Sequence, residues 1–188
     1  MGRLVYSAIM SVDGYIEDTD GGFAWAEPDP ELHGFVNDQS RRFGTHLYGR
    51  RLYEMMTGWE TDPSLAAESP LMRDFAELWQ AADKIVYSTS LTEVVTARTR
   101  LERSFDPEAV RALKSESTED LLIGGPDLAR HAFAAGLVDE CELYLVPVSV
   151  GGGKPGLPAG AFVRLTLTDL RRFTGGAVML RYRVNGAG

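Results

Sequence analysis

The residues with the clearest chemical potential form a glycine pair that follows a short apolar run. Leu121–Ile123 is typical of a buried parallel strand, and Gly124, Gly125 and Pro126 come directly after it. Glycine permits unusual dihedral angles and the close approach of a ligand, and proline suits the first turn of a helix. Because a helix N-terminus attracts anions, the segment predicts either a phosphate site or a plain strand-to-helix turn.

Two further segments add arginines and hydroxyl groups. Arg50 and Arg51 follow the expected strand 45–48, and Ser88 and Thr89 follow the expected strand 84–88. Ligands of open α/β sheets bind at the carboxyl ends of the strands, where arginine can fork onto a phosphate. An arginine pair in a helix's first turn opposes the helix dipole. An anion partner and a solvated helix start are therefore equal alternatives for this pair.

The elements that must position these residues alternate along the chain. Helices are expected to begin near Pro30, Gly49, Pro70, Pro107 and Pro126. The region 61–69 is expected to be a polar loop, and Pro147 predicts an edge position or a bulge in a strand over 140–150. Further strands are expected over 3–9, 97–101, 163–173 and 177–184. The order predicts an α/β fold with a mostly parallel sheet, helices on both faces and an antiparallel C-terminal hairpin edge.

Composition narrows the class of protein. The chain has 188 residues, 44% of them hydrophobic, with 27 acidic and 19 basic residues and a net charge of −8. We expect one domain over 1–188 with no nucleic-acid or membrane partner, because the chain is acidic and has no apolar run approaching about 20 residues. Cys141 is the only cysteine. We therefore expect a buried thiol, no metal site and a cytoplasmic location.

Several motifs together resemble one known family. They resemble the dihydrofolate reductase-like fold family, in particular the branch containing the reductase domain of riboflavin biosynthesis, the RibD C-terminal-like domain. The resemblance covers nearly the whole chain and implies a three-layer fold. It rests on the order and spacing of six segments, at 11–16, 48–54, 123–125, 136–140, 146–148 and 151–155.

The resemblance implies a reductase that uses NADPH. Gly49 and Arg50 would lie near the cofactor phosphates, with Arg50 facing the 2′-phosphate, and Ser88 would support the adenosine. Gly124 and Gly125 would back the pyrophosphate and the nicotinamide. The full set implied to bind NADPH is Gly14, Gly49, Arg50, Arg51, Ser88, Thr89, Gly124, Gly125, Pro126, Asp127 and Leu128.

Two departures favour the riboflavin branch over the folate enzymes. Leu52 stands where folate reductases usually carry a hydroxyl group, and Pro126 replaces a third glycine. The loop at Asp13 would cover the nicotinamide, as the family's mobile loop does.

The proton donor is assigned by the same resemblance. Glu31 occupies the position of the carboxylate that folate reductases place on their first helix, and Asp13 is a second candidate. A carboxyl group in an apolar pocket has a raised pKa and can protonate a substrate. The alternative for Glu31 is an ordinary first-turn glutamate. His33, His46 and His131 are expected to be exposed or locally bonded.

These expectations leave three functions open. The first is an NADPH-dependent reductase of a small heterocyclic or carbonyl-type substrate, of the pterin, folate or ribosylaminopyrimidine class. The second is a non-catalytic NADPH-binding sensor, and the third is a structural homodimer. A homodimer built from the C-terminal strands is also expected for the reductase, because the apolar run 143–150 would be hazardous as an open edge and the hairpin 163–184 adds further apolar side chains. Alternatively, the hairpin covers that edge within one chain.

Overall fold

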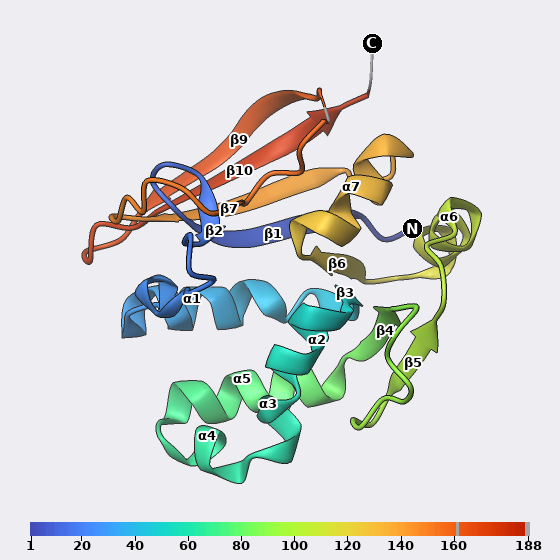
Figure 1. Ribbon diagram of the computed structural model, residues 1–188, viewed down its shortest axis with the longest axis horizontal. Helices are drawn as coiled ribbons and strands as arrows, with labels where there is room; N and C mark the ends of the chain where they lie inside the picture. Colours follow the sequence, from blue (N-terminus) through green and yellow to red (C-terminus); the bar gives the residue numbers. More distant parts are fainter. Residues whose placement is uncertain (161, 187–188) are drawn as a thin grey trace.

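An eight-stranded sheet forms the centre of the computed structural model, which describes residues 1–160 and 162–186 (Figure 1). The strand order is β5-β4-β3-β6-β1-β7-β10-β9. Pairing is parallel from β5 to β7 and antiparallel where β10 joins β7 and β9. The bounds are β1 Leu4–Ser11, β3 Phe43–Gly49, β4 Asp83–Tyr87, β5 Thr99–Glu102, β6 Asp120–Gly124, β7 Glu140–Val146, β9 Arg164–Arg172 and β10 Val178–Asn185. The predicted mostly parallel sheet with an antiparallel hairpin edge is confirmed.

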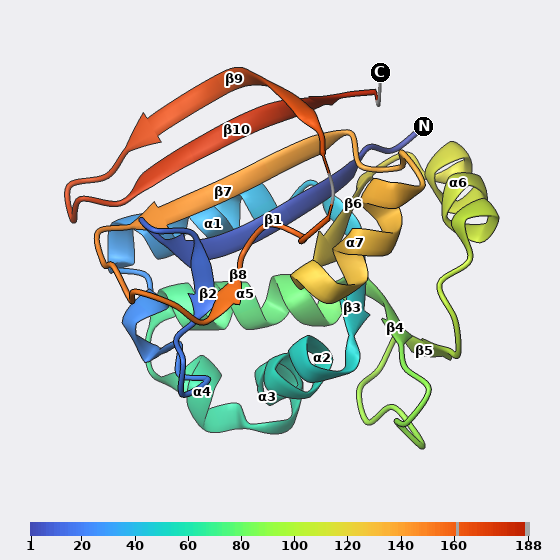
Figure 2. The same cartoon turned by 45° about the horizontal axis from the view of Figure 1, so that its top comes forward.

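Helices cover both faces of this sheet, which gives three layers (Figures 1 and 2). Helices α1, α2 and α5 lie on one face, and α6 and α7 lie on the other. Their bounds are α1 Pro30–Ser40, α2 Arg50–Met56, α5 Pro70–Ala81, α6 Pro107–Glu116 and α7 Pro126–Ala134. Four of the five begin with proline, which needs no partner for a missing N–H, so the sequence predicted these starts well.

The side chains of the central strands alternate between the two faces. Leu47 and Ile123 point toward α7, and neither exposes any surface. Tyr48 and Val86 point the other way, against the buried ring of Trp79 on α5. The core therefore lies on both sides of the parallel strands, as their continuous apolar runs require.

Two sequence-based expectations are wrong. The region 61–69 is not a plain loop, because it follows α3 (Gly58–Thr61) and contains α4 (Pro63–Ala67). Asp62 caps α4 by accepting a hydrogen bond from the backbone N–H of Ser64 at 3.0 Å. Pro147 does not mark an edge strand either. Strand β7 ends at Val146 and lies between β1 and β10.

A small second sheet crosses the carboxyl end of β1. It pairs β2 (Tyr15–Glu17) with β8 (Lys154–Pro155) in antiparallel orientation. Strand β8 lies in the glycine-rich segment 151–156. One 3₁₀ turn, η1 (Ala24–Ala26), precedes α1. Within the described ranges, no helix is both long and apolar enough to cross a membrane.

His46 is a buried titratable group in this core. Its Nδ1 lies 2.8 Å from the hydroxyl of Tyr48, and that hydroxyl accepts a hydrogen bond from Trp79 at 3.3 Å. Burial, helped by the charge of Lys84, lowers the pKa of His46 from 6.5 to about 3. The folded protein therefore keeps this imidazole neutral at pH values where the unfolded chain protonates it.

We predict that His46 makes the fold acid-sensitive. Below pH 6.5 the unfolded chain binds a proton that the folded chain rejects, so the free energy of unfolding falls as the pH drops from 7 to 5. The difference is about 2 kcal/mol. Denaturant unfolding at both pH values should show a smaller pH dependence for His46→Asn than for the wild type. The exposed His131→Asn is the control. An unchanged pH dependence in His46→Asn would contradict the prediction.

Candidate functional site

The register of β3 aligns the ends of three parallel strands. Tyr48 is level with Val86 of β4 on one side and with Gly124 of β6 on the other. The turns that follow these strands therefore begin side by side at one edge of the sheet. These turns contain the glycines, arginines and hydroxyl groups singled out in the sequence, so the fold brings them together as expected for an open α/β sheet.

The turn between β6 and α7 has a backbone that only glycine adopts readily. Gly125 has a φ of +82°, and no side chain caps the helix it precedes. A Cβ on Gly124 would lie 2.5 Å from Cδ2 of Leu52. The backbone conformation therefore favours glycine at 125, while the buried Gly124 leaves room for the end of the Leu52 side chain, and the half-buried Gly125 leaves a backbone surface free of side-chain atoms at the start of α7. Such a surface fits the phosphate groups of a dinucleotide.

The turn between β3 and α2 carries the predicted arginines. Arg50 is the first residue of α2, and its Nη1 lies 3.1 Å from Oε2 of Glu54 one turn later. The Arg50 side chain is 43% exposed. An exposed pair of this kind contributes little stability. Arg50 can therefore leave Glu54 for a stronger anion at small cost.

The turn after β4 is shaped by the hydroxyl group of Ser88. Its Oγ accepts hydrogen bonds from the backbone N–H groups of Ser90 and Leu91 at 3.2 and 2.9 Å. Arg103 closes the same turn by donating to the carbonyl groups of Ser88 and Leu91. Thr89 is exposed at the tip of the turn. Ser88 therefore stabilises this turn, in addition to the cofactor contact that the family resemblance implied.

Asp13 ties two loops together at the carboxyl end of β1. Its carboxylate accepts hydrogen bonds from the Ser149 hydroxyl at 2.9 Å and from the backbone N–H groups of Val150 and Gly151 at 3.2 and 2.7 Å. Hydrogen bonds, the largest from Ser11, hold the pKa of Asp13 well below its usual range. The group stays ionised at neutral pH, so these contacts favour a positioning role over proton donation.

Gly14 completes the same loop. It has a φ of +92°, and its carbonyl accepts a hydrogen bond from the backbone N–H of Gly156 at 2.8 Å.

Glu31 lies at the first turn of α1, beside the hairpin that joins β9 to β10. Its Oε2 accepts a hydrogen bond from the backbone N–H of Thr174 at 2.8 Å, and its side chain is 41% exposed. Asp29 caps the same helix by accepting from Leu32 at 2.9 Å. The position of Glu31 thus gives it a hairpin contact and leaves its carboxylate partly exposed.

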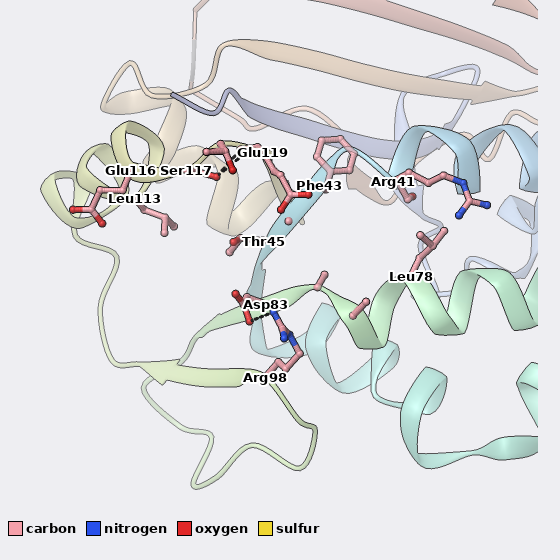
Figure 3. A pocket seen from close by; sticks show the side chains of 15 residues that line it. Arg41, Phe43, Thr45, Leu78, Asp83, Arg98, Leu113, Glu116, Ser117 and Glu119 are labelled. Carbon is pink, nitrogen blue, oxygen red and sulfur yellow. Dashed lines mark hydrogen bonds and ion pairs between the residues drawn. The ribbon is translucent and has the colours of Figure 1, made fainter.

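Two hollows open at the opposite, amino edge of the sheet. The one in Figure 3 has a volume of about 430 Å³ and lies at the starts of β3 and β4. Both of its arginines already have partners: Arg98 pairs with Asp83 at 2.9 Å, and Arg41 pairs with Asp74 at 2.8 Å. The second, of about 680 Å³, is lined by ion-paired residues including Arg42. We therefore place the functional site at the carboxyl edge.

The remaining chemically notable groups give no second site. Burial raises the pKa of the Cys141 thiol to about 12, so this cysteine is unreactive. Within residues 1–160 and 162–186, no three His, Cys, Asp or Glu side chains gather so as to hold a metal ion. The sequence missed Lys154, which lies 2.7 Å from Asp127 in the first turn of α7. The family segment 151–155 includes this lysine, but no local pattern shows that it meets Asp127.

Comparison with known proteins defines the class and then the family. The chain has the dihydrofolate reductase-like fold: it matches a dihydrofolate reductase from Enterococcus faecalis, solved in complex with NADP(H), with a TM-score of 0.66 and 15% identity over 98% of this chain and 97% of that one. The family model described as the RibD C-terminal domain matches residues 3–179. The chain therefore belongs to the RibD C-terminal domain family, as the sequence motifs predicted.

Two further relatives span the full length of the chain. A protein from Shewanella sp. PV-4, named for riboflavin biosynthesis, matches with a TM-score of 0.75 and 20% identity over 97% of this chain and 99% of that one. The uncharacterized protein YyaP of Bacillus subtilis strain 168 is 26% identical over 185 residues, which are 98% of this chain and 96% of YyaP.

We predict that Gly125→Ala lowers the free energy of unfolding by about 1–3 kcal/mol, because an L side chain is strained at this positive φ. Gly49→Ala is the matched control at the neighbouring turn. Gly49 has a φ of −77°, and its added Cβ would meet only Leu128 at 3.9 Å. Urea unfolding of both variants measures the difference. Equal stability of the two variants would show that the Gly125 backbone relaxes without strain.

Proposed function

We propose that this protein is an NADPH-dependent reductase of the cytoplasm that reduces a small heterocyclic or carbonyl-type substrate of the pterin, folate or ribosylaminopyrimidine class. The alignment of three glycine- or hydroxyl-bearing turns at one sheet edge is the observation that carries the proposal. Membership of the RibD C-terminal domain family supports it.

The residues at this edge fit the parts of NADPH. The bare turn at Gly124 and Gly125 accommodates the pyrophosphate, and Arg50 supplies a guanidinium group for the 2′-phosphate. Bound NADPH would supply the hydride. The chain itself would bind the cofactor and the substrate and orient them toward each other. The hydrogen bonds that Asp13 accepts from Ser149 and Gly151 hold its loop at the carboxyl end of β1.

A non-catalytic NADPH-binding protein is the second candidate. One observation favours it: both carboxyl groups expected to move a proton are engaged elsewhere. Asp13 accepts hydrogen bonds from the Ser149 hydroxyl and from the backbone of residues 150 and 151, and Glu31 accepts one from the backbone of Thr174. NADPH oxidation by the purified protein with dihydropterins and ribosylaminopyrimidines separates the two. Turnover of any of these supports the reductase, and tight NADPH binding without turnover supports the sensor.

We predict a preference for NADPH over NADH that depends on Arg50. Losing a charge-assisted contact to the 2′-phosphate costs about 1.5–3 kcal/mol, or about ten- to a hundred-fold in affinity. Calorimetry should show that Arg50→Ala weakens NADPH binding by this factor and leaves NADH binding unchanged. Arg73→Ala, an exposed arginine on α5, is the charge-matched control. Equal wild-type affinity for both dinucleotides would refute the prediction.

We also propose a homodimer whose contact surface lies on strands β9 and β10 and not on the run 143–150. Strand β10 covers β7 within the chain, so the run 143–150 is not an edge, and Tyr144 is 2% exposed. The edge strand is β9, where Leu167 and Leu170 are 50% and 57% exposed. Leu180 of β10 pairs directly with Leu170. This exposed apolar face would be buried by a two-fold copy of itself.

We predict that Leu170→Asp converts the dimer into a monomer, because an unpaired charge at an apolar interface is costly. Light scattering after size exclusion at micromolar concentration measures the mass. Val95→Asp is the control, since Val95 is 61% exposed and lies in the loop between β4 and β5. A wild-type mass equal to the 20.6 kDa of one chain would rule out the dimer.

A further inference from the structure

Lys154 places a positive charge beside the turn at the start of α7. Its Nζ lies 2.7 Å from Oδ2 of Asp127, the second residue of that helix. The two partners differ in burial: the Lys154 side chain is 22% exposed, whereas that of Asp127 is 81% exposed. The Lys154 side chain is therefore the more enclosed of the two, and the exposed carboxylate is the partner that can leave.

A rigid frame holds Lys154 in place. Lys154 pairs with Glu17 across the small sheet of β2 and β8, which lie in front of β1 in Figure 2. Gly153, with a φ of +130°, lets this strand approach the carbonyl of Glu17 more closely than any side chain would allow. Gly156 then accepts a hydrogen bond from the buried Tyr6 hydroxyl. Contacts on both sides of Lys154 thus fix its backbone.

The charge of Asp127 conflicts with an anion at this turn. Its carboxylate sits in the first turn of α7, where it benefits from the helix dipole but would repel a phosphate group bound at Gly125. In the free protein Lys154 neutralises Asp127, and the exposed Asp127 side chain can turn into solvent when a phosphate takes its place. A phosphate oxygen also competes well for the ammonium group, because an exposed lysine–carboxylate pair is weak.

We propose that Lys154 is a positioning residue for the pyrophosphate of the dinucleotide, and that it exchanges Asp127 for a phosphate oxygen when the dinucleotide binds. This inference rests on the proposed function, because the ligand is the cofactor proposed above. It differs from the assignment of Arg50, which concerns the 2′-phosphate alone. Both NADPH and NADH carry the pyrophosphate, so Lys154 acts on the two dinucleotides alike.

The test is calorimetric binding of NADPH and NADH to the intact protein at low and at moderate salt. Lys154→Met should weaken both dinucleotides about tenfold, and Lys154→Arg should restore the affinity to within about threefold of the wild type. Asp127→Asn should bind as tightly as the wild type or more tightly. Raising the salt should weaken wild-type binding more than binding by Lys154→Met, since one ionic contact is missing.

Arg111→Met is the matched control, because it also removes one cation that is paired with a carboxylate, here Glu108 on the distant helix α6. Thermal melting of every variant shows whether the fold is retained. Wild-type affinity in Lys154→Met would overturn the inference and leave the proposed function standing. An effect on NADPH alone, an equal loss in Arg111→Met, or no recovery in Lys154→Arg would also overturn it. A wild type that binds neither dinucleotide overturns both.

Discussion

The parallel pairing of β3 with both of its neighbours is the constraint on which the site depends. Tyr48 stands level with residues of β4 and β6, so the three following turns start at the same height. A slip of one residue would exchange the faces of Leu47 and Tyr48 and would bury each against the wrong helices. The Tyr48 hydroxyl resists that exchange because it would lose the hydrogen bond that it accepts from Trp79 on α5. The same packing that stabilises the core thus aligns the turns.

At the opposite, amino edge of the sheet, ion pairs hold the strands together. Arg42 pairs with Glu142 at 2.5 Å and with Glu140 at 3.1 Å, and Arg181 of β10 pairs with the same two carboxylates at 3.3 and 3.4 Å. Glu142 is 1% exposed and is shared by two arginines, so only the loss of both would leave its buried charge unpaired, at a cost of roughly 3–5 kcal/mol. This network ties the C-terminal hairpin to the start of β3. Ion pairs therefore join the strands at the amino edge, whereas the glycine-lined turns lie at the carboxyl edge.

Local signals explain what the sequence could and could not predict. The helix starts at Pro30, Pro70, Pro107 and Pro126 and the turn at Gly124 were predictable, because proline and glycine restrict the backbone independently of the rest of the chain. The place of β7 inside the sheet was not, because it depends on pairing with residues 178–183.

The partners of the site residues could not be predicted from the sequence either. Asp13 binds residues more than 130 positions away, and Lys154, on the strand β8 that pairs with β2, meets Asp127 from 27 positions away. The family resemblance assigned roles to Asp13 and Glu31, but no local pattern revealed that both contact distant backbone groups.

The cations at the carboxyl edge show how an acidic protein can select an anion. The chain carries a net charge of −8, yet Arg50 and Lys154 stand beside the glycine turns, and each is held by a carboxylate from its own surroundings. A singly charged ion gains little by replacing a carboxylate of equal charge. A ligand with several phosphate groups can replace both carboxylates in one binding event and adds hydrogen bonds to the turn backbone. The paired state therefore favours extended, multiply charged ligands over small anions.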